Sequence, residues 1–266
     1  LQKIDFGSAT LLRPLQWFNQ IDPRDPLQLT NGVYGLLGRY YFSTNANIWV
    51  WGLLGNEKTR GFEVLETNKN TPEFGARIQL PIPKGEIAFS YHHRDANSEN
   101  FLALPQYKHI GENRFGLDAK WDIEVGFWFE ATHTIKNKNI GTFTNQTLLN
   151  IGTDYTFGLA NGLNLVAEHL VTSFDTNAFE FKNPQNTSAF SISYPLGLFD
   201  NISFMHYYNW NSKDNTVFLN YEHQFNKFTG YVMTYYNPKV QQGIQDNDYQ
   251  NHFSGPGIRL MLVFNH

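Results

Sequence analysis

A chain of 266 residues is long enough for one large all-β unit or for two ordinary domains. Aromatic residues make up 16% of it and charged residues 17%; the net charge is −4 and there is no cysteine. This composition excludes disulfide and thiolate chemistry and gives nucleic-acid binding no basic cluster to rest on. No apolar run approaches the ~18 residues of a membrane helix, which excludes that class as well.

Alternation of apolar and polar residues predicts strands over most of the chain, because successive side chains of a strand point to opposite faces. In the first predicted strand Ile4 and Phe6 are expected to face outward, whereas the facing of residues 47–54 is ambiguous. Fourteen strands are predicted, at 1–7, 33–42, 47–54, 73–80, 86–94, 114–122, 124–132, 146–157, 163–172, 187–194, 201–210, 216–225, 228–236 and 257–265.

The hairpin at residues 113–134 shows the two faces most clearly. Phe115, Leu117 and Phe127 fall on a face that is aromatic and aliphatic throughout, while Arg114 and Glu130 fall on a face with charges of both signs. Strands of about 9–11 residues that are apolar toward lipid and polar toward the interior are typical of transmembrane barrels. The sequence therefore predicts one domain, residues 1–266, folded as an antiparallel up-and-down transmembrane β-barrel of about fourteen strands.

The connections between the predicted strands alternate in length. Short turns are predicted at 43–45, 81–85, 121–124, 158–162, 195–200 and near 226, and the connections between them are mostly long and polar, with 211–215 as the exception. Short periplasmic turns and long outer loops are typical of bacterial outer-membrane barrels. Both termini are then expected on the short-turn side, with an even number of strands and the first strand closing onto the last.

The overall pattern resembles the porin-like outer-membrane barrels of Gram-negative bacteria. Residues 258–264, Ile-Arg-Leu-Met-Leu-Val-Phe, look like the C-terminal strand that the barrel-assembly machinery recognises, although Asn265 and His266 follow the phenylalanine that usually ends that family. The run Gln2-Lys3-Ile4-Asp5-Phe6-Gly7 with the later Asp22-Pro23-Arg24-Asp25 is similar to a segment of alginate-export-type porins. In those porins more strands precede this segment, so the resemblance implies residues missing before Leu1.

Charged residues on the inward faces are the main candidates for function. Such groups set the field of a pore and filter ions and polar solutes; the alternative is a lattice of ion pairs that fills the interior, as in narrow barrels. The candidates that would line a lumen are Arg39, Glu73, Arg77, Glu86, Arg94, Arg114, Asp118, Lys120, Glu124, Glu130, Asp154, Glu168, Glu222 and Arg259.

The proline-containing segment 8–32 is too long and irregular for an ordinary turn, and connections of this kind are usually functional or lie on the surface. Folded inward, it would form a constriction with Arg13, Trp17, Asp22, Arg24 and Asp25, in which Trp17 and its neighbour Phe18 would offer a platform for sugar rings. The alternative is an extracellular loop.

Enzyme and metal sites find little support in the sequence. His92 and His93 are adjacent on one predicted strand, so they point to opposite faces and cannot share a ligand. Outer-membrane phospholipase A has a His-x-Ser-Asn-Gly motif, and the run that begins at His93 has no serine at the required spacing. Residues 246–248, Asp-Asn-Asp, could hold calcium in a loop or simply be solvated. No catalytic residue, metal or cofactor is predicted.

The sequence thus predicts a porin-like channel of the bacterial outer membrane, through which small polar solutes diffuse along a charged lumen. Its expected partners are outer-membrane lipid and the barrel-assembly machinery. One alternative is a structural subunit of an outer-membrane protein complex with a plugged lumen, and another is an integral membrane hydrolase. The solute and the oligomeric state stay open at this point.

Overall fold

The computed structural model describes residues 1–101, 103–238 and 255–264. Its regular structure there is fourteen strands and one 3-10 turn, Gly141–Thr144. Within the described residues no helix is long and apolar enough to cross a membrane. The strands are β1 (Gly35–Tyr41), β2 (Asn47–Leu53), β3 (Glu66–Thr67), β4 (Glu73–Ile82), β5 (Gly85–Asn97), β6 (Ile110–Asp122), β7 (Gly126–Lys136), β8 (Asn145–Phe157), β9 (Leu163–Asp175), β10 (Gln185–Pro195), β11 (Asp200–Asn209), β12 (Asn215–Gln224), β13 (Phe228–Tyr236) and β14 (Pro256–Phe264).

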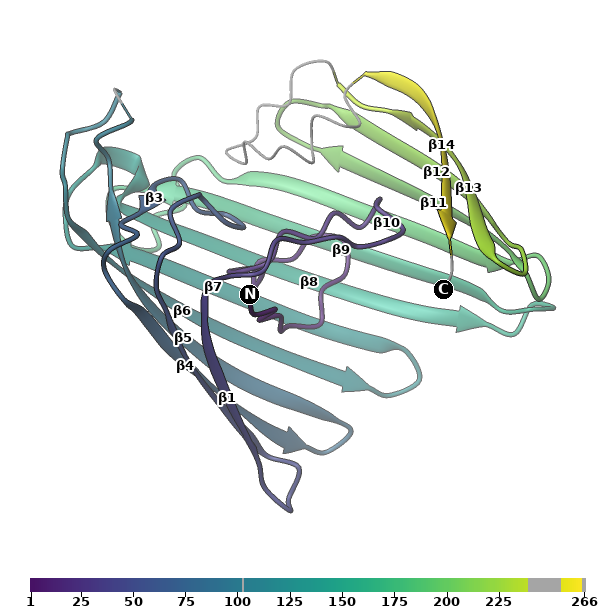
Figure 1. Ribbon diagram of the computed structural model, residues 1–266, viewed down its shortest axis with the longest axis horizontal. Coiled ribbons are helices and arrows are strands. Elements are labelled where there is room, and N and C mark those ends of the chain that lie inside the picture. The colour runs from purple at the N-terminus through teal and green to yellow at the C-terminus, as the bar shows by residue number, and fades with distance from the viewer. Residues whose placement is uncertain (102, 239–254, 265–266) are drawn as a thin grey trace.

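All strands belong to one antiparallel sheet in which neighbours in sequence are neighbours in space, so the predicted all-β, up-and-down class is confirmed. The order runs β1-β2-β4 and then consecutively to β14, and the two-residue β3 pairs with the end of β5. Figure 1 shows the sheet strongly curled, with the N-terminal segment lying over its inner face. The order begins at β1 and ends at β14, and these two strands do not pair in the part of the chain that the structure describes.

The connections alternate in length as the sequence predicts. Six short ones, 42–46, 83–84, 123–125, 158–162, 196–199 and 225–227, lie at one edge of the sheet. The exception is the equally short connection 210–214, which lies at the opposite edge, as the sequence predicts. Lys84 and Asn45 adopt the left-handed conformation in two of the six turns, with φ of 59° and 66°, as tight hairpin turns require. The longer connections, including residues 54–72 and 98–109, lie at the opposite edge. The candidate calcium ligands at 246–248 and the last two residues lie outside the described residues.

The first predicted strand, residues 1–7, is wrong. Only a single bridge, Gln2 to Val33, forms there, and Ile4 and Phe6 are buried on the inner face instead of facing outward. They pack against Trp51 of β2 and against Trp17 and Phe18 farther along the same segment. A seven-residue alternation cannot distinguish a strand from an extended segment whose apolar side chains are buried by distant contacts. The predicted and observed totals are both fourteen because two errors cancel: the strand predicted at 1–7 does not form, and the two-residue strand β3 was not predicted.

The strand register shows, for every long strand, which side chains point to the inner face of the sheet and which to the outer face. In β2, which was ambiguous, Trp51 is 4% exposed and points inward, while Val50 is 53% exposed on the outer face. Large apolar side chains on the outer face are 38–75% exposed in strands from β2 to β14: Val50, Phe74, Ile78, Phe89, Phe115, Phe127, Ile151, Leu219, Val232 and Leu260. The sheet is therefore apolar on its outside and largely polar on its inside, the reverse of a water-soluble β-sandwich.

Candidate functional site on the inner face of the sheet

The predicted lumen charges lie on the inner face of the sheet, with one exception. Glu124 lies exposed in the turn between β6 and β7, because the hairpin turn takes up residues 123–125 and ends the alternation there. The buried members are Glu73, Arg77, Arg94, Arg114, Asp118, Glu130 and Glu168. The more exposed members are Arg39, Glu86, Lys120, Asp154, Glu222 and Arg259. Burial thus divides the predicted set into two groups with different surroundings.

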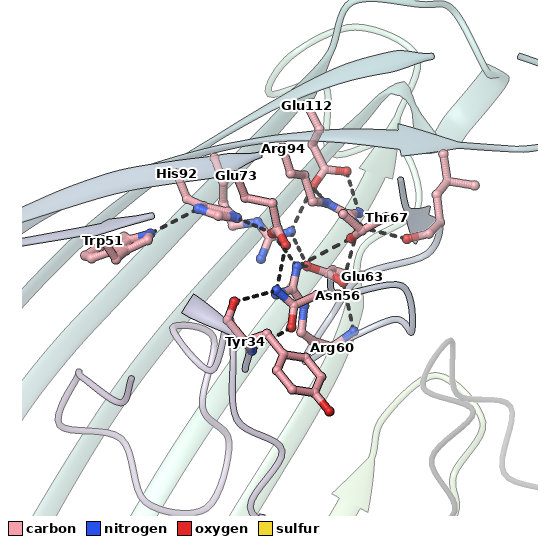
Figure 2. A network of polar contacts seen from close by, with 12 residues as sticks. Tyr34, Trp51, Asn56, Arg60, Glu63, Thr67, Glu73, His92, Arg94 and Glu112 are labelled. Atoms are coloured by element: carbon pink, nitrogen blue, oxygen red, sulfur yellow. Dashed lines mark hydrogen bonds and ion pairs between the residues drawn. The ribbon is translucent and has the colours of Figure 1, made fainter. Parts of the chain in front are cut away.

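A network of buried charges, which we call the β4–β7 network, joins the long-loop ends of these strands (Figure 2). Arg94 of β5 donates to Glu112 of β6 at 2.7 Å and lies 3.2 Å from Glu63. Arg114 donates to Glu112 at 2.7 Å and to Glu63 at 3.1 Å, and Lys136 of β7 lies 3.4 Å from Glu112. Every carboxylate here faces more than one cation, so the group acts as a unit rather than as separate pairs.

Two members of the β4–β7 network come from the long connection 54–72, which folds inward. Arg60 donates to Glu73 at 2.6 Å and to Glu63 at 3.3 Å. Burial by itself would lower the pKa of the Arg60 guanidinium, but the carboxylates of Glu63 and Glu73 raise it above its ordinary value, so Arg60 stays charged. The sequence did not indicate Arg60 or Glu63, because charges in a polar loop are usually solvated. The available signal was their apolar neighbours, of which Leu65 is buried.

His92 is held in one tautomer by its two partners. The indole N–H of Trp51 donates to its Nδ1 at 3.1 Å, so Nδ1 carries no proton, and Nε2 donates to Glu73 at 3.1 Å. His93 points to the outer face, where its Nδ1 lies 2.9 Å from Asn113. Both nitrogens of His92 are therefore occupied by structural contacts, and no serine or cysteine joins them as a nucleophile.

The N-terminal residues 1–33, which we call the inner segment, are bound to the sheet through their backbone. Ser8 and Ala9 donate N–H groups to Glu130 of β7, Ala9 at 2.8 Å. Thr10 and Leu11 donate to Glu168 of β9 at 2.6 and 3.1 Å, and the N–H of Leu12 reaches the second oxygen of the same carboxylate. Two inward carboxylates thus accept the consecutive backbone N–H groups of residues 8–12.

Glycine is required where the inner segment approaches Glu130. Gly7 has a φ of +97°, which side chains rarely adopt, and a Cβ there would lie 2.6 Å from Glu130 Oε1. Between the two carboxylates and the β4–β7 network, Arg77 of β4 makes a two-pronged pair with Asp118 of β6, at 2.6 and 2.7 Å. The buried charges on the inner face from β4 to β9 are therefore matched by partners within the fold.

The residues predicted to form a constriction all lie in the inner segment, but they make different kinds of contact. Trp17 is buried beside Phe6, and Phe18 packs edge-on against His92 at 4.9 Å, so neither ring offers a platform for a solute. Arg13 pairs with Asp5 at 2.6 Å. Asp25 accepts the N–H groups of Leu27 and Leu29 at 3.1 Å and so shapes its own turn.

Arg24 and Asp22, the remaining constriction residues, form one pair at 2.7 Å. The Arg24 guanidinium also donates to the side chain of Asn237 at 3.2 Å, which links the inner segment to the chain just after β13. Burial alone would lower the pKa of Arg24, but the hydrogen bond and charge of Asp22 raise it. The inner segment is thus held by ion pairs at Arg13 and at Arg24.

The described residues hold no group of three or more His, Cys, Asp or Glu side chains that could bind a metal ion. Comparisons with family models, with curated proteins and with solved structures found no match. The inner face therefore has to be interpreted from its own geometry. It combines one half, from β4 to β9, that contains buried and matched charges with another, from β10 to β14, where most inward side chains are partly exposed.

Proposed function

We propose that the chain forms an integral β-barrel of the bacterial outer membrane and passes small polar solutes along its inner face. The observation that carries the proposal is the outer surface. Large apolar side chains are exposed on the outer face of β2, of β4 to β8 and of β12 to β14, and those on the outer face of β9 to β11 are partly exposed. Monomeric soluble proteins rarely leave such a large contiguous apolar surface in water, whereas hydrocarbon solvates it.

The strand lengths support the same proposal. The strands from β4 to β14 contain 9–13 residues each, and about 9–11 tilted residues cross the hydrocarbon core. In lipid every backbone N–H and C=O group has to be paired within the protein, which antiparallel neighbours achieve between β1 and β14. The proposal requires in addition that the two edge strands, β1 and β14, close onto each other in the membrane. Trp121, Tyr155 and Trp210 lie near strand ends, where aromatic rings favour the boundary between lipid and water.

The solute path in this proposal runs beside the inner segment, along β9 to β14. The β4–β7 network and the inner segment cover the other half, so solutes meet the partly exposed inward side chains of the later strands, including Tyr207 and Glu222. The inner segment then acts as a fixed constriction, which replaces the sequence-based alternative of an extracellular loop. The C-terminal strand β14 is proposed to bind the barrel-assembly machinery.

The first experiment measures insertion into vesicles. Phe115→Asp places a charge in the middle of β6 on the outer face, and we expect it to reduce insertion, at a cost below the about 2–4 kcal/mol that Arg or Lys would incur at the same depth. Asn113→Asp, on the same face of the same strand but near its end, is the matched control and should cost much less, because charge is tolerated near the interface. A purified chain that is monodisperse in buffer without detergent would contradict the membrane proposal.

The second experiment measures conduction. Full-length protein reconstituted in planar bilayers should give steady ohmic current steps that detergent alone does not give. A second candidate function, a structural subunit of an outer-membrane complex, is favoured by one observation: the β4–β7 network fills its part of the interior with buried ion pairs. Correct insertion combined with electrical silence would support that structural role and reject the channel.

A further inference from the structure

We infer that a cavity between the inner segment and β9–β12 is a binding site for a neutral saccharide. This inference deepens the proposed function by naming a solute class and a site on the path, and it rests on that function only for its biological setting. The cavity has a volume of about 860 Å³, within the usual range of ligand pockets. It lies where the covered half of the inner face meets the half that is partly exposed.

The walls of the cavity come from parts of the chain that are distant in sequence. The inner segment provides one wall with Gln16 and Gln20, and the inward side chains of β9 to β12 provide another with Thr172 and Tyr207. Phe62 of the inward-folded connection also lines it. These elements are held in place by the contacts described above, because the backbone of residues 8–12 is bound by Glu130 and Glu168. The cavity is therefore a built feature of the fold.

The cavity lining combines apolar side chains with many uncharged hydrogen-bonding groups. Side-chain amides and hydroxyls of both donor and acceptor character line it: Gln16, Gln20, Asn183, Gln185, Asn209, Asn211, Thr142, Thr172, Thr187, Ser212, Thr216 and Tyr207. Such groups match a ligand that carries many hydroxyls, since each hydroxyl both donates and accepts. A hydrocarbon ligand would leave them without partners at a free-energy cost.

The positive charges in the lining are already paired. Arg13 pairs with Asp5, and Arg24 pairs with Asp22. Asp214 lies in the lining as well, so no surplus positive charge is available to a carboxylate, sulfate or phosphate on a ligand. Electrostatics therefore selects a neutral solute over an anionic one.

Two further features point to a sugar ring rather than to a general polar solute. Phe143 and Phe174 pack edge to face at 5.3 Å, and both rings are partly exposed where they line the cavity. Aromatic rings of this kind provide a flat apolar surface for the C–H face of a pyranose. The hydroxyl of Tyr207 is buried and has no hydrogen-bond partner among the described residues, which leaves it available for a ligand hydroxyl.

The test titrates full-length protein in an amine-oxide detergent, which has no sugar headgroup, with maltotriose by isothermal titration calorimetry. We expect saturable binding. Tyr207→Phe should weaken it by about threefold to tenfold, as the loss of one hydrogen bond would, and Phe174→Ala by about tenfold. Tyr208→Phe, the adjacent residue on the outer face, and Phe157→Ala, on the outer face of β8, are the matched controls and should leave the affinity unchanged.

Absence of saturable maltotriose binding would overturn the inference, and so would three further results. The first is equal or tighter binding of trigalacturonate, the anionic probe, and the second is binding of trialanine in place of maltotriose. The third is maltotriose binding that neither Tyr207→Phe nor Phe174→Ala weakens. Planar-bilayer current tests the channel separately from the saccharide site. Saturable saccharide binding by a protein that does not conduct would support the site and contradict the channel. Conduction without saccharide binding would support the channel and contradict the site.

Discussion

The inner faces of β4–β9 and β10–β14 belong to one continuous sheet, yet they are packed in different ways. In the first half, most of the inward ionisable side chains are buried, and each buried carboxylate is matched by cations or backbone N–H groups. In the second half, a small apolar cluster of Phe218, Tyr231 and Met233 lies beside partly exposed polar residues. The same alternating pattern can therefore produce either a sealed interior or an accessible one, depending on which other segments fold against it.

The largest effect is expected from Glu112→Gln in the sealed half. The substitution leaves Arg94, Arg114 and Lys136 buried without their shared carboxylate, which should destabilise the fold by about 3–5 kcal/mol. Thermal unfolding in detergent, followed by near-UV circular dichroism, measures it. Glu222→Gln is the counterpart in the other half and should change stability by less than about 1 kcal/mol. Equal losses for both variants would remove the distinction between the halves.

Glu168→Ala is expected to release the middle of the inner segment. The carboxylate accepts the N–H groups of Thr10, Leu11 and Leu12, and hydrogen bonds to a charged group contribute about 1.5–3 kcal/mol. Amide hydrogen exchange at these residues should accelerate by about tenfold or more. Glu86→Ala, near the short-turn edge, serves as the control, because the Glu86 carboxylate accepts a hydrogen bond from the Gln79 side chain of the neighbouring strand and not from the inner segment. Unchanged exchange in Glu168→Ala would show that apolar packing alone holds the segment.

Gly61→Ala tests the contact between the two segments that seal the first half. A Cβ at Gly61 would lie 1.9 Å from the carbonyl oxygen of Gln16, and the residue has a φ of +53°. Gly55 also has a positive φ, +86°, but its Cβ would meet no neighbouring atom. Gly55→Ala therefore measures only the cost of placing alanine at a positive φ, without a steric clash. We expect Gly61→Ala to lose about 1–2 kcal/mol more than Gly55→Ala in chemical denaturation. Equal losses would mean that connection 54–72 moves freely away from the inner segment.

The smallest effect is expected from charge in the accessible half. Glu222 is partly exposed on the inner face of β12, and Glu222→Gln should reduce the cation-to-anion permeability ratio by about twofold or less, because salt screens exposed charges. Reversal potentials in a salt gradient measure the ratio. The control is Glu124→Gln, since Glu124 lies in the turn and not on the inner face. A larger change for Glu124→Gln than for Glu222→Gln would place the solute path elsewhere.

The strands were predictable because their signal is local. Alternation placed Arg77, Glu130 and Glu168 on the inner face, and the register agrees with it. Alternation failed where a side chain's neighbours are distant in sequence. Ile4 and Phe6 are buried by Trp51, and nothing within residues 1–7 could indicate that contact.

The candidate site was harder to predict than the fold for the same reason. Alternation predicted that Arg94 and Arg114 face inward, and they do. Their shared partner Glu63, however, comes from a polar loop whose sequence predicts exposure to solvent. Trp17 was expected to face a solute, and it lies in the apolar core because Phe6 and Trp51 provide partners for it. The cavity of the saccharide proposal is formed by residues from 11 to 238, a convergence that no single stretch of sequence reveals.

The way in which Glu168 holds the inner segment has a consequence for how this protein can change over time. The carboxylate grips main-chain amides of residues 10–12, which every amino acid except proline supplies. The side chains at these positions are therefore free to drift while the attachment persists. Related chains could thus share an N-terminal segment attached in this way even when its amino-acid sequence is no longer similar.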